Sequence, residues 1–242
     1  SFCLIIFNRA VEDDKTEGDV LGSYDQCAFV GTDAPEAGHM QGEMIGKYLS
    51  ENYDAADLNG DGKPDCVAVF IGTDKRFQNK NEGLGEEVFD TNPRILTVAF
   101  GAAGGGFKLH TQNNDFIVSA ETPTQTEPFQ GITIEKGVLK FVFEEFYSAG
   151  SWTSGSRRYT FRYQNGEITL IGVEKTAVHR ASGDIETRSY NFMTGKMSID
   201  KGHISDDGTG KVRWRKFTLK PLPTLRNVKP MFNWEIEKDV FI

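Results

Sequence analysis

Residues 158–173 read RYTFRYQNGEITLIGV, and this stretch decides the fold class. Two runs rich in aromatic and β-branched residues, Arg158–Tyr163 and Ile168–Val173, flank the turn Gln164-Asn165-Gly166. Such residues favour pleated, half-buried strands. Asn-Gly readily supplies the two positive φ angles of a type I′ turn. The stretch therefore predicts an antiparallel β-hairpin.

Further strand-like runs lie on both sides of this hairpin, with Gly, Asn, Asp and Ser clusters between them. Three Trp and 15 of the 18 Phe lie after residue 56. We therefore interpret residues 57–242 as a β-rich, antiparallel domain. The expected strands span 67–71, 95–100, 107–110, 116–119, 131–134, 138–147, 185–193 and 212–219. The expected irregular segments are a polar loop at 74–93, a glycine-rich turn at 101–106 and a loop at 221–230 before a short final strand.

Residues 1–56 have a different pattern. Phe2–Phe7 and Cys27–Val30 are apolar runs of strand length, and apolar residues then recur at helical spacing over residues 34–50. Thr32 or Asp33 suits the N-cap of that helix. The predicted fold class is therefore α+β, predominantly antiparallel β, with a small N-terminal α/β segment at 1–56.

Charge supports the same boundary. The chain has 242 residues and a net charge of −8, and residues 1–56 hold eleven acidic against three basic residues, whereas the remainder holds 24 of each sign. An acidic chain argues against a nucleic-acid partner, because phosphate binding needs concentrated basic surface. No apolar run approaches the ~20 residues of a membrane span. The run FCLIIF at 2–7 has no charged segment before it, so we do not expect a signal peptide within this sequence.

The three cysteines, Cys3, Cys27 and Cys66, have no CxxC spacing. This argues against a disulfide framework or a zinc site. Each lies in an apolar run, which predicts buried thiols.

The sharpest motif is DLNGDGKPD at 57–65. Oxygen-bearing side chains occupy positions 1, 3 and 5, a glycine occupies position 6, and calcium prefers oxygen ligands in such loops. We predict a structural Ca²⁺ bound by Asp57, Asn59, Asp61, the carbonyl of Lys63, and Asp65. Position 12 is Ala68 rather than glutamate, so the loop is not a complete EF-hand. The alternative is a metal-free Asn/Asp/Gly turn.

Residues 1–63 resemble part of the bacterial periplasmic galactose/glucose-binding proteins. The similarity is carried by LIIFNRAV at 4–11, by SYDQCAFVGTDAPEAGHMQGEMIGKYL at 23–49 and by DLNGDGK at 57–63. It implies that Asn8 contacts a hexose ligand, that Asp57, Asn59 and Asp61 bind calcium, and that the protein is periplasmic.

Residues 57–242 resemble FG-GAP/VCBS-like β-rich proteins, secreted or lipid-anchored, of Bacteroides-type bacteria. The loop and following strand, DLNGDGKPDCVAVF, carry this similarity together with the segments at 90–100, 131–141, 150–172 and 191–197. It implies calcium binding and an extracytoplasmic location, and it carries no assigned activity.

Three functions follow from these patterns. The first is a non-enzymatic, extracytoplasmic binding or surface protein with a calcium loop. The alternative is a periplasmic galactose/glucose-binding protein, or a fragment of one, using Asn8. The third is a polysaccharide hydrolase using Glu144 and Glu145. Adjacent strand residues point to opposite faces, so these two carboxylates are poor catalytic partners.

Overall fold

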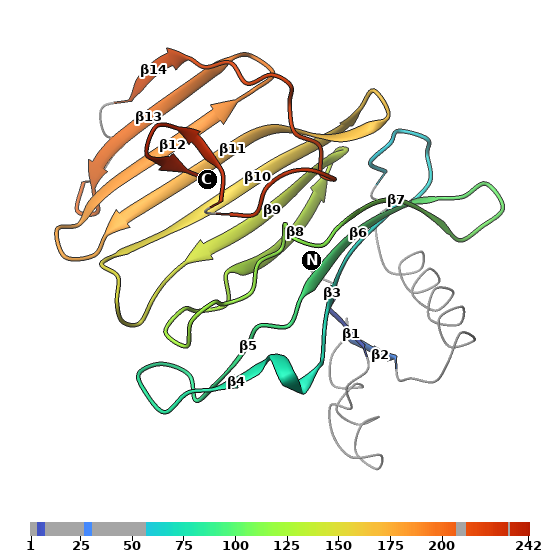
Figure 1. The fold of residues 1–242 in the computed structure, drawn as a ribbon. Helices are drawn as coiled ribbons and strands as arrows, with labels where there is room; N and C mark the ends of the chain where they lie inside the picture. The colour runs from blue at the N-terminus through green and yellow to red at the C-terminus, as the bar shows by residue number, and fades with distance from the viewer. Residues whose placement is uncertain (1–3, 8–26, 31–56, 207–211, 232) are drawn as a thin grey trace.

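The computed structural model describes residues 4–7, 27–30, 57–206, 212–231 and 233–242 (Figure 1). Its largest element is a seven-stranded antiparallel sheet in which every strand pairs with its neighbours in the sequence. The order is β14-β13-β12-β11-β10-β9-β8, a meander that needs only hairpin connections. The bounds are β8 Phe129–Glu135, β9 Val138–Glu145, β10 Thr153–Gln164, β11 Glu167–His179, β12 Asp184–Asn191, β13 Lys196–His203 and β14 Arg213–Lys216.

Three smaller antiparallel sheets accompany it. The first has three strands in the order β3-β6-β7, and the other two are the hairpins β4-β5 and β15-β16. Their bounds are β3 Cys66–Ile71, β4 Gln78–Lys80, β5 Val88–Asp90, β6 Arg94–Gly101, β7 Phe107–Asn113, β15 Glu235–Glu237 and β16 Val240–Phe241, with a short 3₁₀ helix, η1, at Lys75–Phe77. The predicted β-rich, antiparallel class is therefore confirmed.

The N-terminal α/β prediction finds little support. The described part of this segment is one parallel pair, β1 at Leu4–Phe7 and β2 at Cys27–Val30. The helix predicted over 34–50 lies outside the described residues, as does Asn8. No helix within the described residues is long and apolar enough to cross a membrane.

The β10–β11 hairpin forms as predicted. Asn165 and Gly166 have φ of 53° and 83°, and Gln164 pairs with Glu167 across the turn. Both strands are longer than the aromatic runs suggest, because each also carries polar residues toward its far end. The turn thus sets the register of the two central strands of the large sheet.

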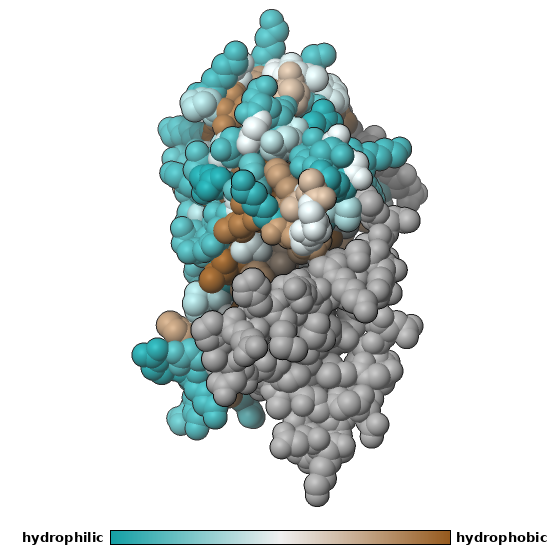
Figure 2. All heavy atoms as spheres, turned by 90° about the vertical axis from the view of Figure 1, so that its right-hand side faces the viewer, coloured by the Kyte–Doolittle hydropathy of each residue, from teal (hydrophilic) through white to brown (hydrophobic). Residues whose placement is uncertain are grey.

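The hydrophobic core lies on one face of the large sheet. Alternate residues of β9 and β10 are fully buried there: Leu139, Phe141, Phe143, Tyr159 and Phe161. Leu96 and Val98 of β6 belong to the same cluster, as does Leu225 in the segment after β14. The face of the molecule in Figure 2 is mostly hydrophilic above, with hydrophobic atoms gathered in a band lower down.

One predicted strand is absent, and some strands were not predicted. Residues 116–119, expected as a strand, are loop, yet Phe116 is fully buried and its ring makes edge-to-face contacts with Phe141 and Phe161. The apolar run at 116–119 therefore marks a segment that packs into the core and is not a strand. The strand β13 at 196–203 was not predicted, and the polar loop expected at 74–93 contains η1, β4 and β5. Cys66, predicted to be buried, is partly exposed in β3.

Candidate functional site

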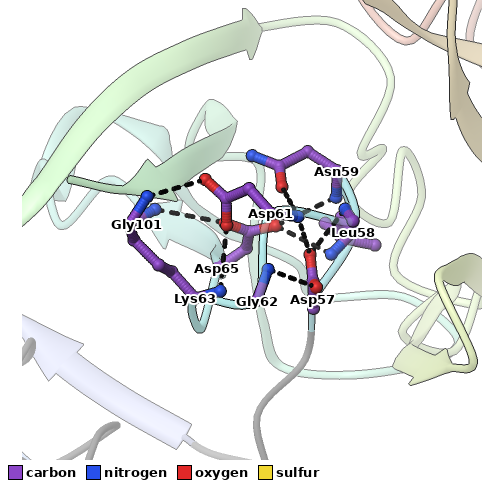
Figure 3. Close-up of polar contacts among 9 residues, drawn as sticks. Asp57, Leu58, Asn59, Asp61, Gly62, Lys63, Asp65 and Gly101 are labelled. Atoms are coloured by element: carbon purple, nitrogen blue, oxygen red, sulfur yellow. Dashed lines mark hydrogen bonds and ion pairs between the residues drawn. The ribbon is translucent and has the colours of Figure 1, made fainter. Parts of the chain in front are cut away.

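The loop at 57–65 lies directly before β3 and is organised by its own side chains (Figure 3). Asp57 Oδ1 accepts hydrogen bonds from the amides of Gly60 and Asp61 at 2.6 and 3.1 Å, and Oδ2 accepts one from Gly62 at 2.8 Å. Gly60 and Gly62 both have φ of 79°, a conformation that glycine adopts without steric cost. The glycines therefore let the backbone close around the first aspartate.

Two further side chains order the turn. Asn59 Oδ1 accepts a hydrogen bond from the Asp61 amide at 2.9 Å, and Asp61 Oδ1 accepts one from the Lys63 amide at 2.9 Å. Such hydrogen bonds between a side-chain oxygen and a nearby backbone amide are typical of Asn and Asp in turns. Lys63 Nζ also contacts Asp61 Oδ2 at 3.2 Å. The Lys63 amide, together with this ion pair, lowers the pKa of the Asp61 carboxyl below its ordinary value.

Asp65 has a different position. It is buried, and its Oδ2 accepts hydrogen bonds from the amides of Leu58 and Asn59 at 2.7 and 3.3 Å. Its Oδ1 accepts a third, at 3.1 Å, from the amide of Gly101 at the end of β6. Burial raises the pKa of the Asp65 carboxyl, and the hydrogen bonds from Leu58 and Gly101 act against that rise. Both oxygens of Asp65 thus face backbone donors and join the loop to the three-stranded sheet.

The loop is anchored at two further points. Leu58 is 5% exposed and belongs to the main core cluster. A Cβ added to Gly101 would lie 2.6 Å from the carbonyl oxygen of Pro64, which shows how closely the loop approaches β6. The Asp57 carbonyl lies near Gly137, in the turn between β8 and β9. The loop therefore contacts both the small and the large sheet.

The predicted ligand residues are brought together in part. Figure 3 shows Asp57, Asn59 and Asp61 along the inside of one turn, with Asp65 directed towards Gly101. Carboxylate and amide oxygens have two lone pairs each, so the oxygens that accept one amide, Asp57 Oδ2, Asn59 Oδ1 and Asp61 Oδ1, can still bind a cation. The donor chemistry therefore fits calcium, a hard cation with oxygen ligands. Within the described ranges, however, no three or more His, Cys, Asp or Glu side chains are placed to hold a metal ion together.

One partner of the loop was missed by the sequence analysis. The Gly101 amide that binds Asp65 lies 36 residues further along the chain. Its only local signal is the glycine-rich turn that it opens, and nothing in that turn points to residue 65. Such a contact follows from the pairing of β3 with β6, which places Cys66 opposite Ala99.

Comparison with known proteins gives one partial similarity. Over 49 residues the chain is 51% identical to the D-galactose/methyl-galactoside binding periplasmic protein of Haemophilus influenzae. The match covers 20% of this chain and 14% of that protein's length. No protein-family profile matches the chain. No solved structure matches it either.

Proposed function

We propose that the chain is a non-enzymatic, extracytoplasmic binding or surface protein whose β-rich domain begins with a calcium-binding loop. The observation that carries the calcium assignment is the Asp57 carboxylate, which accepts hydrogen bonds from the amides of Gly60, Asp61 and Gly62. These bonds fold residues 57–62 around the Asp57 carboxylate. Asn59 and Asp61 add oxygen ligands on the same turn. The similarity to a periplasmic protein supports the extracytoplasmic location.

The ion would have a structural role. The loop leads directly into β3, and its ends are already fixed by the burial of Leu58 and by the contact of Asp65 with Gly101. A bound cation would offset the mutual repulsion of Asp57 and Asp61 and hold the middle of the loop in its folded conformation.

Calcium titration tests the proposal. We expect isothermal titration to show binding with a stoichiometry of one, and the thermal midpoint to rise on adding calcium and fall on adding chelator. Calcium at a hundredfold excess over its Kd stabilises by about 2.7 kcal/mol. Asp61→Asn keeps the acceptor for the Lys63 amide and removes the charge, whereas Asp57→Asn removes the charge and one of the two oxygens that accept turn amides. Each should reduce the calcium-dependent rise.

Asp74→Asn is the matched control. Asp74 is another Asp that accepts a nearby amide, that of Arg76 at 2.9 Å, but it lies at the start of η1. Its variant should retain the full calcium response. A melting temperature that does not respond to calcium or chelator in the unmodified protein would refute the calcium loop.

The alternative function is hexose binding. It is supported by the 51% identity over 49 residues to a protein named for galactose and methyl-galactoside binding. Asn8 is the residue proposed for sugar contact. A thermal shift or tryptophan fluorescence change with galactose or glucose that is abolished by Asn8→Ala would favour this alternative over the first proposal.

The two glutamates that suggest a hydrolase lie on opposite faces of β9. Glu144 is exposed, whereas the Glu145 side chain is 19% exposed and its carboxylate pairs with Arg157 at 3.0 Å. A retaining or inverting glycosidase needs two carboxylates across one glycosidic bond. This arrangement supports the non-enzymatic proposal. Glycan hydrolysis that is lost in both Glu144→Gln and Glu145→Gln would contradict it.

A further inference from the structure

The face of the large sheet that carries the core changes from apolar to charged toward one end. Arg157 of β10 pairs directly with Lys175 of β11, and Lys175 pairs directly with Arg188 of β12. Directly opposed residues of an antiparallel sheet share a face, and like charges in such positions repel. The sheet thus aligns three cations in one row, which we call the cation row (Arg157, Lys175, Arg188).

The outer members of the cation row are balanced by carboxylates. Arg157 forms an ion pair with Glu145 at 3.0 Å, and Arg188 forms ion pairs with Glu186 and, at 3.6 Å, with Glu237. Lys175 differs from both. Its Nζ donates a hydrogen bond at 2.8 Å to the carbonyl of Phe241, a neutral acceptor, and it forms no ion pair with any described residue.

The central lysine therefore carries an unbalanced charge at a half-buried position. Burial, followed by repulsion from Arg157, lowers the pKa of Lys175 below its ordinary value, and Glu145 and Glu186 only partly oppose this. An anion placed beside the ammonium group would relieve both effects, because an opposite charge favours the charged form.

An open cleft of about 450 Å³ lies over this part of the sheet. Arg157 and Lys175 supply its cations, Glu145 its carboxylate, Ser151 and Thr153 its hydroxyls, and Ala177 and Phe241 its apolar surface. Its size lies in the usual range of small-ligand sites, which is roughly 300–1,000 Å³.

Small residues keep the cleft open. Ala177 pairs with Gly155 in the row next to the cation row, and Gly155 pairs with Glu145 on its other side. A Cβ at Gly155 would lie 2.1 Å from the carbonyl oxygen of Thr176, so this position cannot carry a side chain without moving backbone. Two small residues, Gly155 and Ala177, therefore lie opposite each other beside the cation row, and Ala177 lines the cleft.

The C-terminal hairpin forms one wall. Figure 1 shows β15 and β16 in front of β11 and β12, and Lys175 and Arg188 hold this hairpin through Phe241 and Glu237. Phe241 is 43% exposed at the cleft. An exposed ring beside hydroxyl and charged groups suits a ligand with one apolar face and several polar edges.

We infer that this cleft binds a small carboxylated ligand rich in hydroxyl groups, of the uronic acid type, with its carboxylate on Lys175, beside the Arg157–Glu145 ion pair. Ser151, Thr153 and Glu145 would exchange hydrogen bonds with the hydroxyls, and Phe241 would pack against the ring. The assignment rests on the proposed binding role but not on the calcium loop. The loop lies at the start of β9, next to Gly137, and the cleft at its end, at Glu145, roughly 23 Å away along the strand.

The test is calorimetric titration of the full chain with galacturonate and glucuronate in the presence of chelator. Galactose, glucose and inorganic phosphate are titrated in parallel. We expect the uronates to bind at least tenfold more tightly than the neutral sugars and phosphate. Equal binding of the neutral sugars would overturn the role of the carboxylate, and equal or tighter binding of phosphate would overturn the role of the hydroxyl groups.

Lys175→Met keeps most of the side-chain length and removes the charge, and it should weaken uronate binding at least tenfold. Lys140→Met is the matched control, because Lys140 also lies in the large sheet but pairs with Glu135 at 3.0 Å. Ala177→Leu fills the cleft without changing charge, and it should also abolish binding. It tests the site if Lys175→Met proves unstable. Undetectable uronate binding, or binding unchanged in a folded Lys175→Met or Ala177→Leu, would refute the site. Because chelator is present throughout, failure of the calcium proposal leaves this result intact.

Discussion

Asp65 Oδ1 accepts a hydrogen bond at 3.1 Å from the backbone amide of Gly101, across the gap between a loop and the end of β6. The other oxygen of the same buried carboxylate accepts the amides of Leu58 and Asn59. One side chain therefore satisfies three backbone donors from two segments. Buried donors that lose such a partner cost free energy, because water cannot fully replace it.

We predict that Asp65→Ala lowers the free energy of unfolding by about 2–4 kcal/mol, since it leaves the three amides without their acceptor. Urea denaturation followed by circular dichroism measures the loss. Asp74→Ala, which removes exposed contacts to the amide and the guanidinium of Arg76 only, should cost roughly 0.5–1 kcal/mol. If Asp65→Ala is no less stable than Asp74→Ala, the contact between the loop and β6 does not stabilise the fold.

A second prediction concerns Phe116. Its fully buried ring makes edge-to-face contacts with four aromatic rings at centroid distances of 5.2–5.8 Å: Phe141, Phe143, Tyr159 and Phe161. Phe116→Ala should cost about 3–5 kcal/mol, because it removes this contact area and leaves a cavity. Phe77→Ala, at a site that is 41% exposed, is the control and should cost much less. Similar losses in the two variants would show that residue 116 packs differently.

The sequence predicts the part of this structure that depends on neighbours in the chain. The Asn165-Gly166 turn and the strand expected at 138–147 rest on local signals, and the structure shows both the turn and β9 at Val138–Glu145. The loop around Asp57 was likewise found from the spacing of its residues. These features are encoded within about ten residues of sequence.

The remainder depends on strand register. Arg157, Lys175 and Arg188 look like separate basic residues in the sequence, and only the pairing of β10, β11 and β12 aligns them. The pairing of β10 with β11 has a register shift between Thr160 and Phe161, which adds one residue to the loop between paired positions. Counting outward from the turn therefore does not give the pairing of Arg157 with Lys175. The cleft could therefore not be predicted from spacing, although each of its residues is visible in the sequence.

His110 gives a prediction about pH. Its ring stacks on Phe100 with centroids 4.3 Å apart. Burial lowers the pKa of this imidazole from its ordinary value of 6.5, and Arg226 acts in the same direction against Glu167 and Asp65. The folded state therefore binds the proton less readily than the unfolded state. The stability that the neutral imidazole contributes is complete above pH 6.5, and it is lost as the pH falls through the lower pKa of His110 in the folded state.

We expect His110→Phe, which can still stack on Phe100, to lose this part of the pH dependence. Urea unfolding between pH 8 and pH 5 measures it, and the unmodified protein should lose more stability below pH 6.5 than the variant. The range from pH 7.5 to 8 is the internal control, because the imidazole is neutral there in both states. Parallel pH profiles for the two proteins throughout would contradict a half-buried, neutral His110.

The turn at the centre of the large sheet gives the last prediction. Gly166 has φ of 83°, which costs a residue with a Cβ about 1–2 kcal/mol. Gly166→Ala should therefore destabilise by about 1 kcal/mol and slow folding, if the β10–β11 hairpin forms in the transition state. Gly104→Ala is the matched control, since Gly104 also lies in a hairpin turn, no atom lies within 4 Å of an added Cβ, and its φ is outside the left-handed region. That variant should stay within about 0.5 kcal/mol of the unmodified protein. Equal effects at the two glycines would show that the turn conformation at 165–166 does not contribute specifically to stability.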